Sequence, residues 1–82
     1  MDYLLLVRGA CIFMGNFAER LKLLRDQQDI SQDALGKQIG VSRYAVYTYE
    51  KGKAYPNVEG LMALADYFNV SVDYLLGRSD ER

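Results

Sequence analysis

Residues 43–48 bring together four side chains with the chemistry needed to contact the edges of nucleic-acid bases. Arg43 carries parallel N–H donors that match the O6 and N7 acceptors of guanine, and Thr48 offers a methyl group for a thymine methyl or a hydroxyl for a base edge. Tyr44 and Tyr47 each combine a hydroxyl, which can bond a phosphate or a base, with a ring that can pack on a sugar or a thymine methyl. These residue types predict a nucleic-acid contact.

Helical spacing places these four side chains on one side of a helix. Arg43 and Tyr47 are four residues apart, and so are Tyr44 and Thr48, so the members of each pair are neighbours on a helix surface. Val46 and Tyr49, three residues apart, fall on the other side. We therefore predict that Tyr49 is largely buried, while Tyr44 and Tyr47 are presented to a partner.

Positive charge follows this stretch at Lys51 and Lys53, which would attract phosphates without reading sequence and would lose that attraction as salt rises. The whole chain carries a formal net charge of −1, which argues weakly against a nucleic-acid binder. The charge is unevenly distributed, however. Residues 17–57 hold seven Lys or Arg and five Asp or Glu, whereas the remainder holds three and six. The middle of the chain is therefore mildly basic, which permits a basic face.

The composition excludes the commoner kinds of catalytic and metal site. The 82 residues contain no histidine, the commonest general base and metal ligand, and the single cysteine, Cys11, can form neither an internal disulfide nor a cysteine-based zinc site. The sequence also has no nucleophile–base pair and no phosphate-cradling glycine loop. We expect one small domain that is not an enzyme and needs no metal or cofactor. A lone cysteine fits the reducing cytoplasm.

No apolar run is long enough to cross a membrane, since runs such as residues 4–7 fall far short of the roughly 20 residues required. The N-terminus resembles a secretion signal only superficially, because Asp2 stands where positive charge is expected and Arg8 interrupts the apolar stretch. We therefore expect a cytoplasmic protein without a membrane partner.

Five helices are predicted, each from apolar side chains and from a polar residue able to cap its start. Gly40, Gly52 and Gly77 are placed to end three of them, and Pro56 keeps the residue before it extended. Residues 17–77 show no strand-like alternation, so the expected class is all-α. The predicted helices cover about residues 17–27, 31–40, 42–51, 58–68 and 72–76, with Asn16, Ser31, Ser42, Asn57 and Ser71 as their respective N-caps.

The second and third predicted helices are joined by only the residues "IGVS". A connection this short makes the two helices cross steeply instead of lying antiparallel, which is the geometry of a helix-turn-helix. The third helix, residues 42–51, would then present its N-terminal residues to the major groove of DNA.

The stretch "SQDALGKQIGVSRYAVYTYEKGKAYPN", with "NVSVDYLLG" downstream, resembles the Cro/XRE-type helix-turn-helix family of phage repressors and bacterial regulators over about residues 17–77. The resemblance implies an all-α, five-helix, lambda-repressor-like domain that binds double-stranded DNA. It further implies a sequence-specific transcriptional regulator, more typically a repressor, bound as a homodimer to a palindromic operator with helix 42–51 in the major groove.

The same resemblance assigns roles to single residues. Gln32 matches a position that contacts a phosphate and often supports the reading helix. Arg43, Tyr44 and Thr48 match the base-reading positions, and Tyr47 lies beside them. Lys51 and Lys53 match positions that contact the DNA backbone. Arg25 and Glu50 match a pair that ties the first helix to the third. The candidate DNA-binding residues are Gln32, Ser42, Arg43, Tyr44, Tyr47, Thr48, Lys51 and Lys53.

Two features depart from the family pattern. Gly36 stands where alanine is usual, and because both residues are small, close helix packing is expected to survive. Tyr44 and Tyr47 replace the commoner small polar residues. The second departure leaves the operator sequence open, but not the fold.

Other interpretations of these residues remain open. Exposed aromatic side chains also mark protein–protein interfaces, so Tyr44 and Tyr47 could form such a patch. The alternative from another class is an antitoxin or a protein-interaction module that uses the fold with little DNA affinity. A controller of restriction–modification genes is an alternative within the DNA-binding class. Arg43 and the two lysines could also be solvated surface residues without a partner.

The chain divides into an apolar N-terminal extension (residues 1–15), a helix-turn-helix domain (16–77) and a polar tail (78–82). The extension, with "YLLLV" and "CIFM", is too apolar to be an idle tail. It could reflect a translation start at Met14, or it could form an arm that packs on the core, on a second subunit or on another protein. The other candidates for a dimer interface are Tyr74, Leu75 and Leu76.

Overall fold

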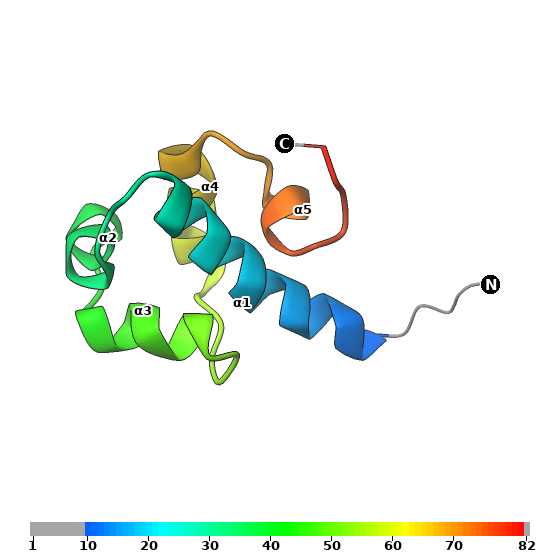
Figure 1. The fold of residues 1–82 in the computed structure, drawn as a ribbon, viewed down its shortest axis with the longest axis horizontal. Helices are drawn as coiled ribbons and strands as arrows, with labels where there is room; N and C mark the ends of the chain where they lie inside the picture. Colours follow the sequence, from blue (N-terminus) through cyan, green and yellow to red (C-terminus); the bar gives the residue numbers. More distant parts are fainter. Residues whose placement is uncertain (1–9, 82) are drawn as a thin grey trace.

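Helices joined by short connections make up the fold (Figure 1). The computed structural model describes the backbone of residues 10–81 and the side chains of residues 17–81. In this part of the chain every regular element is a helix, which confirms the all-α prediction. The helices are α1 (Ala10–Gln27), α2 (Gln32–Ile39), α3 (Arg43–Glu50), α4 (Val58–Phe68) and α5 (Val72–Leu75).

Four of the five predicted N-caps are confirmed. In each, the residue before the helix has an extended backbone, and its side-chain oxygen accepts a hydrogen bond from the N–H three residues later. Such a cap stabilises a helix by about 1 kcal/mol, because the N–H has no partner inside the helix. The caps are Ser31, Ser42, Asn57 and Ser71, with nitrogen–oxygen distances of 3.0, 3.1, 2.8 and 2.9 Å.

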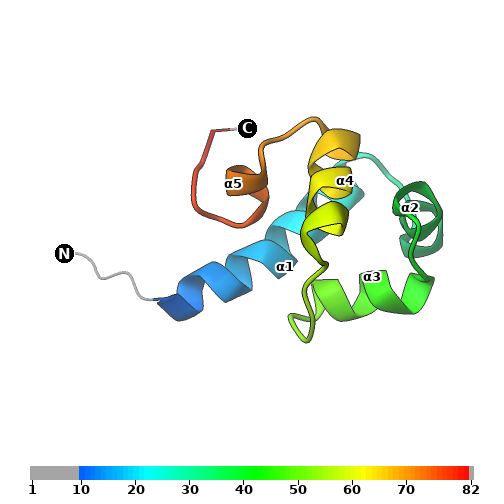
Figure 2. The same ribbon diagram turned by 180° about the vertical axis from the view of Figure 1, so that it is seen from behind.

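The predicted start of the first helix is wrong. Asn16 lies inside α1, which begins at Ala10, and so does not cap it. Gly15 and Asn16 disfavour a helix by at most about 1 kcal/mol each, a weak preference that a continuing helix overrides. The N-terminal end of α1 projects beyond the other helices (Figure 1 and Figure 2). Most of the predicted N-terminal extension, residues 1–9, lies outside the described residues.

One hydrophobic core joins all five helices. Each helix contributes a side chain that is completely buried, and each such side chain stabilises the fold by about 1.5–3 kcal/mol. No helix can therefore be removed without exposing part of the core. These five side chains, from α1 to α5 in turn, are Leu21, Leu35, Val46, Leu64 and Leu75.

The turn between α2 and α3 packs closely against Gly36. Gly40 ends α2 in the left-handed conformation, with φ of 80°, as expected. Close packing survives at Gly36, but glycine and alanine are not equivalent there. A Cβ atom added to Gly36 would lie 2.6 Å from the carbonyl oxygen of Val41, closer than real Cβ atoms approach. The chain after α2 passes directly against the Gly36 backbone, where the N–H of Val41 donates to the Gly36 carbonyl at 2.9 Å.

The segment after α5 curves around that helix (Figure 1) and is tied to α1. Arg20 of α1 donates hydrogen bonds to the carbonyl oxygens of Tyr74 and Ser79, at 2.8 and 2.6 Å, and to the carboxylate of Asp80 at 2.7 Å. The Arg20 guanidinium also lies 4.3 Å from the centre of the Tyr74 ring. The predicted polar tail is therefore held against α1 as far as Asp80.

Among residues 10–81, no helix is long and apolar enough to cross a membrane. Within the same described part of the chain, no group of three His, Cys, Asp or Glu side chains is placed to hold a metal ion.

Candidate nucleic-acid interface

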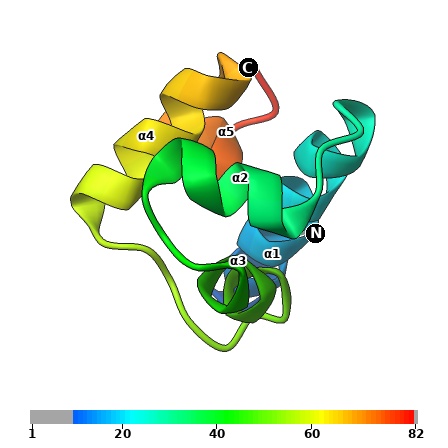
Figure 3. The ribbon, with the colours of Figure 1, turned by 90° about the vertical axis from the view of Figure 1, so that its left-hand side faces the viewer.

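α2 and α3 form the steeply crossed pair expected from their short connection. Only Gly40, Val41 and Ser42 separate the two helices. Figure 3 looks along α3, and α2 runs across it. α3 packs against α2 and α1 and forms one edge of the molecule (Figure 1). This arrangement is that of a helix-turn-helix, with α3 as the exposed second helix.

The two sides of α3 have opposite environments. Val46 is completely buried, and Tyr49 is only 9% exposed, with its ring edge-on to that of Phe17 and 6.4 Å between the ring centres. On the other side, Tyr44 is 72% exposed and Tyr47 is 40% exposed. The prediction of one buried and two exposed tyrosines is confirmed.

Ser42 and Arg43 stand at the start of α3, where a reading helix reaches base edges first. The Ser42 hydroxyl accepts the N–H of Ala45, so this side chain serves as the helix cap. Arg43 is exposed, and its side chain has no hydrogen bond or ion pair with any residue in the described part of the chain. Its guanidinium is therefore available to an external acceptor.

Thr48 is half-buried and more restricted than its sequence position suggests. Its hydroxyl donates to the carbonyl oxygen of Ala45 at 2.7 Å. Because that bond uses the hydroxyl hydrogen, Thr48 can contact a base through its methyl group or as an acceptor, but not as a donor while the bond is kept.

The exposed side of α3 carries a row of two rings and a cation, formed by Tyr44, Tyr47 and Lys51. The rings of Tyr44 and Tyr47 stack, with 6.1 Å between their centres and 29° between their planes. The ammonium group of Lys51 lies 5.6 Å from the centre of the Tyr47 ring, within the range of a cation–π interaction. Lys53 is exposed in the following loop, and no contact within the described residues joins its side chain to this row.

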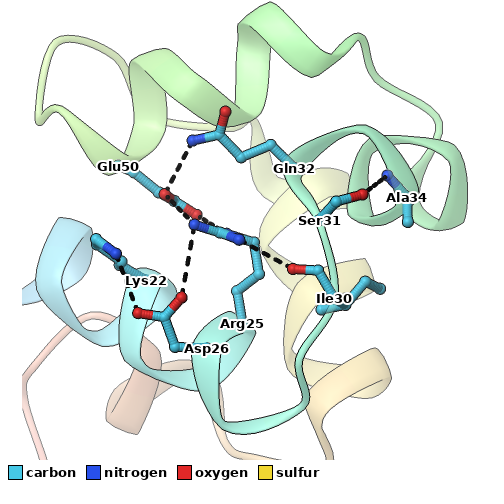
Figure 4. Close-up of polar contacts among 8 residues, drawn as sticks. All are labelled: Lys22, Arg25, Asp26, Ile30, Ser31, Gln32, Ala34 and Glu50. Carbon is cyan, nitrogen blue, oxygen red and sulfur yellow. Dashed lines mark hydrogen bonds and ion pairs between the residues drawn. The ribbon is translucent and has the colours of Figure 1, made fainter.

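A largely buried ionic cluster of Arg25, Gln32 and Glu50 joins α1, α2 and α3 (Figure 4). Arg25 donates two hydrogen bonds to Glu50, 2.6 Å from Nε to Oε2 and 3.1 Å from Nη2 to Oε1. Gln32 donates from Nε2 to the same Oε1 at 3.1 Å, and Arg25 also donates to the carbonyl oxygen of Ile30 at 2.9 Å. The ion pair implied by the family resemblance is thus present. It fixes the end of α3 against the other two helices.

The environment of Arg25 keeps it charged. Hydrogen bonding to Glu50 raises the pKa of Arg25 above its ordinary value, burial opposes this rise, and the charges of Glu50 and Asp26 add to it. Since the pKa is raised, the stabilisation from this group is fully present below the ordinary arginine pKa and is lost only at still higher pH. The cluster therefore does not lose its positive partner at neutral pH.

A hollow of about 320 Å³ lies beside this cluster. Lys22 pairs with Asp26 at 3.0 Å, whereas Lys51 has no ion pair with any described residue. Gln32 supports α3 through Glu50, but its contact with a phosphate stays a prediction. The lining residues are Lys22, Arg25, Gln32, Tyr47, Glu50 and Lys51.

Gln32, Tyr47 and Lys51 were predicted as DNA contacts, and Arg25 and Glu50 as a structural pair. Lys22 was not predicted. Lys22 and Arg25 are three residues apart on α1 and therefore share a face. Once Arg25 was paired with Glu50, that spacing could have placed Lys22 next to the end of α3.

The sequence matches known proteins over most of its length. The helix-turn-helix family model matches residues 21–75. The chain is 42% identical over 60 residues to the HTH-type transcriptional activator BcrR of Enterococcus faecalis, and 43% identical over 58 residues to the repressor protein C2 of Salmonella phage P22. These matches cover 73% and 71% of this chain, but only 29% and 27% of the two relatives. The chain therefore spans less than a third of their length.

Solved structures share the fold. The crystal structure of the P22 c2 repressor in complex with synthetic operator 9T, in the presence of Tl+, has a TM-score of 0.74 at 40% identity, and the match covers 77% of this chain and 96% of that one. The solution structure of the DNA-binding domain of the same repressor has a TM-score of 0.71 at 38% identity, over 80% and 86% of the two chains. Family, sequence and fold agree, and this chain belongs to the Cro/XRE-type helix-turn-helix family of transcriptional regulators.

Proposed function

We propose that this chain binds double-stranded DNA in a sequence-specific manner and regulates transcription, with α3 in the major groove. The observation that carries this proposal is that the exposed side of α3 has cationic and aromatic side chains but no exposed carboxylate. The single acidic residue of α3, Glu50, is 5% exposed and already bonded to Arg25 and Gln32. Such a surface fits a polyanion that displays base edges.

The roles follow from position and chemistry. Side chains in the first turns of α3 reach the bases, and those at its ends and at the start of α2 reach the DNA backbone. We assign base contacts to Arg43, Tyr44, Tyr47 and Thr48, and backbone contacts to Gln32, Ser42, Lys51 and Lys53.

We further propose that the protein is a repressor that binds a palindromic operator as a homodimer. The support is the similarity to the P22 c2 repressor, whose solved structure contains a synthetic operator. The α3 helices of a dimer would enter successive major grooves about 34 Å apart. Blocking a promoter requires contact with DNA alone, whereas activation also requires a surface for the transcription machinery. Such a regulator would act in the cytoplasm on bacterial or phage DNA, without catalysis.

Selection of bound duplexes from a random DNA pool, at about 150 mM salt, tests this proposal. The wild type should enrich a palindrome, and Arg43→Ala should lose it or relax it at one base pair in each half-site, because a bidentate arginine–guanine contact is removed. Arg78→Ala is the matched control. It removes another exposed arginine, which lies beyond α5 in the chain and outside the helix-turn-helix, and should select the same palindrome as the wild type.

The exposure of Tyr44 and Tyr47 favours a second candidate, a protein-interaction module such as an antitoxin. The same selection separates the two. If neither the wild type nor the control variant enriches any sequence, the regulator proposal is overturned, and the exposed side of α3 has to be assigned to a protein partner.

A further inference from the structure

Tyr44 occupies a position that the fold does not need an aromatic ring to fill. It is the most exposed of the large apolar side chains among the described residues, at 72%. At 100° per residue it lies almost opposite the buried pair Val46 and Tyr49 on the helix. It belongs neither to the core nor to the partly buried residues packed on the core. An aromatic side chain placed there gains apolar burial only from an external partner.

Tyr47 restricts the position of Tyr44. Its ring stacks on that of Tyr44 and is itself contacted by the ammonium group of Lys51, so the three side chains form a continuous row. A ring already stacked on a neighbour has less rotamer freedom to lose when it binds. The row therefore presents Tyr44 in a partly fixed orientation.

The charges around this row favour DNA over a protein as its partner. Arg43 precedes Tyr44, Lys51 ends the row, and Glu50 is neutralised within the ionic cluster. An apolar ring framed by unpaired cations matches a partner that offers apolar groups between phosphates. In the major groove the one apolar group is the C5-methyl of thymine.

We propose that Tyr44 is a specificity-determining residue that packs its ring on a thymine methyl group, and that Tyr47 is a positioning residue that holds the Tyr44 ring. This inference rests on the proposed function, since it requires α3 to lie in the major groove. It adds the base that the row recognises: each half-site contains a thymine whose methyl group, and not only its hydrogen-bonding edge, is read. A contact through the Tyr44 hydroxyl is the competing possibility, and it is separable because phenylalanine keeps the ring and lacks the hydroxyl.

The test begins with the duplex that the wild-type protein selects. Each thymine of one half-site is replaced in turn by uracil, which differs only by the missing methyl group, and affinity is measured by fluorescence anisotropy. One position should weaken wild-type binding about fourfold, the effect of burying one methyl-sized group. Uracil placed outside the half-sites is the DNA control and should change nothing.

The protein variants assign the methyl contact to its residue. With Tyr44→Ala the thymine and uracil duplexes should bind equally, whereas Tyr44→Phe should keep the fourfold ratio. Tyr47→Phe, which keeps the stack, should retain the ratio, and Tyr47→Leu should reduce it. Because Tyr44 and Tyr47 are exposed, unfolding midpoints should stay unchanged, which shows that the variants remain folded.

The outcomes are distinguishable. A selected operator with no uracil-sensitive thymine overturns this inference and leaves the proposed function standing. Uracil sensitivity that survives in Tyr44→Ala, or that is lost in Tyr44→Phe as well, overturns the assignment of the methyl contact to the Tyr44 ring. Failure of the wild type to select any DNA overturns the proposed function and this inference together.

Discussion

The two sides of α3 differ in where their side chains find partners. On the inner side, Tyr49 packs against α1, and the carboxylate of Glu50 accepts hydrogen bonds from α1 and α2. On the outer side, Arg43 has no partner in the described chain, and Tyr44 is 72% exposed. The inner side thus secures the position of the helix, and the outer side is left for binding.

This difference separates the effects expected from substitutions. A change on the inner side removes contacts present only in the folded protein, so it lowers the free energy of unfolding. A change on the outer side removes at most a solvent-exposed contact, such as the stack of Tyr44 on Tyr47, and should alter DNA affinity with little change in stability. Unfolding and binding assays on the same variants therefore test the comparison directly.

The largest effect is expected for Glu50→Ala. The substitution leaves Arg25 and Gln32 without their shared acceptor, and removing one partner of a buried ion pair costs about 3–5 kcal/mol. Because the Arg25 side chain is 14% exposed, water partly replaces the lost bond, and we expect the lower value, about 3 kcal/mol. Urea unfolding followed by circular dichroism measures the loss.

Asp33→Ala is the matched control for this prediction. The Asp33 side chain is 59% exposed, and its carboxylate pairs with Lys37 at 3.4 Å on the surface of α2. Such surface pairs contribute at most about 1 kcal/mol. Equal destabilisation by the two substitutions would show that the Arg25–Glu50 pair does not secure α3.

The next largest effect is expected for Arg43→Ala, and it should appear only in binding. Loss of a bidentate contact to guanine costs about 1–3 kcal/mol, or roughly 5- to 150-fold in affinity for the selected operator. Stability should change by no more than about 0.5 kcal/mol, because an exposed side chain without internal partners is removed. An unfolding midpoint that fell as affinity fell would break the separation between the two sides of α3.

A smaller effect on both assays is expected for Gly36→Ala, because the turn between α2 and α3 positions both sides of α3. The added Cβ overlaps the Val41 carbonyl oxygen, and overpacking costs about 1–3 kcal/mol. Alanine returns up to about 1 kcal/mol through its higher helix propensity, so we expect a net loss of about 1–2 kcal/mol. Gln38→Ala, at an exposed position of the same helix, is the control in both assays. If the two variants had the same free energy of unfolding and the same operator affinity, the turn could shift without cost.

Local features of this molecule could be predicted from the sequence, because their causes are local. A serine or asparagine before an apolar stripe caps a helix through one nearby N–H, which identified Ser31, Ser42, Asn57 and Ser71. Helical period alone separated Tyr49 from Tyr44 and Tyr47. The Arg25–Glu50 pair, 25 residues apart, came from the family resemblance and not from the period.

Features that depend on distant contacts could not be predicted in this way. The bonds from Arg20 to Ser79 and Asp80 bridge 59 and 60 residues, and no local pattern announces them. The need for glycine at position 36 arises from the path of the chain five residues later. The beginning of α1 before Asn16 was missed for the opposite reason, since a local break signal was given more weight than a weak propensity deserves.

The smallest effect is expected for Lys51→Ala. The salt dependence of binding separates the two contributions of Lys51, its charge and its packing on the Tyr47 ring. Removing one phosphate contact should make the slope of log affinity against log salt shallower by about 1, without changing the selected sequence. Lys37→Ala is the control, because this lysine lies on α2, pairs with Asp33 and should leave the slope unchanged. At high salt the phosphate contribution vanishes, whereas packing of the Tyr47 ring against Lys51 is much less screened. If the affinities of wild type and Lys51→Ala converge at high salt, Lys51 contributes charge alone. A remaining difference would mean that Lys51 also holds the Tyr47 ring in place. In that case the difference should disappear when Tyr47 is replaced by leucine in both proteins.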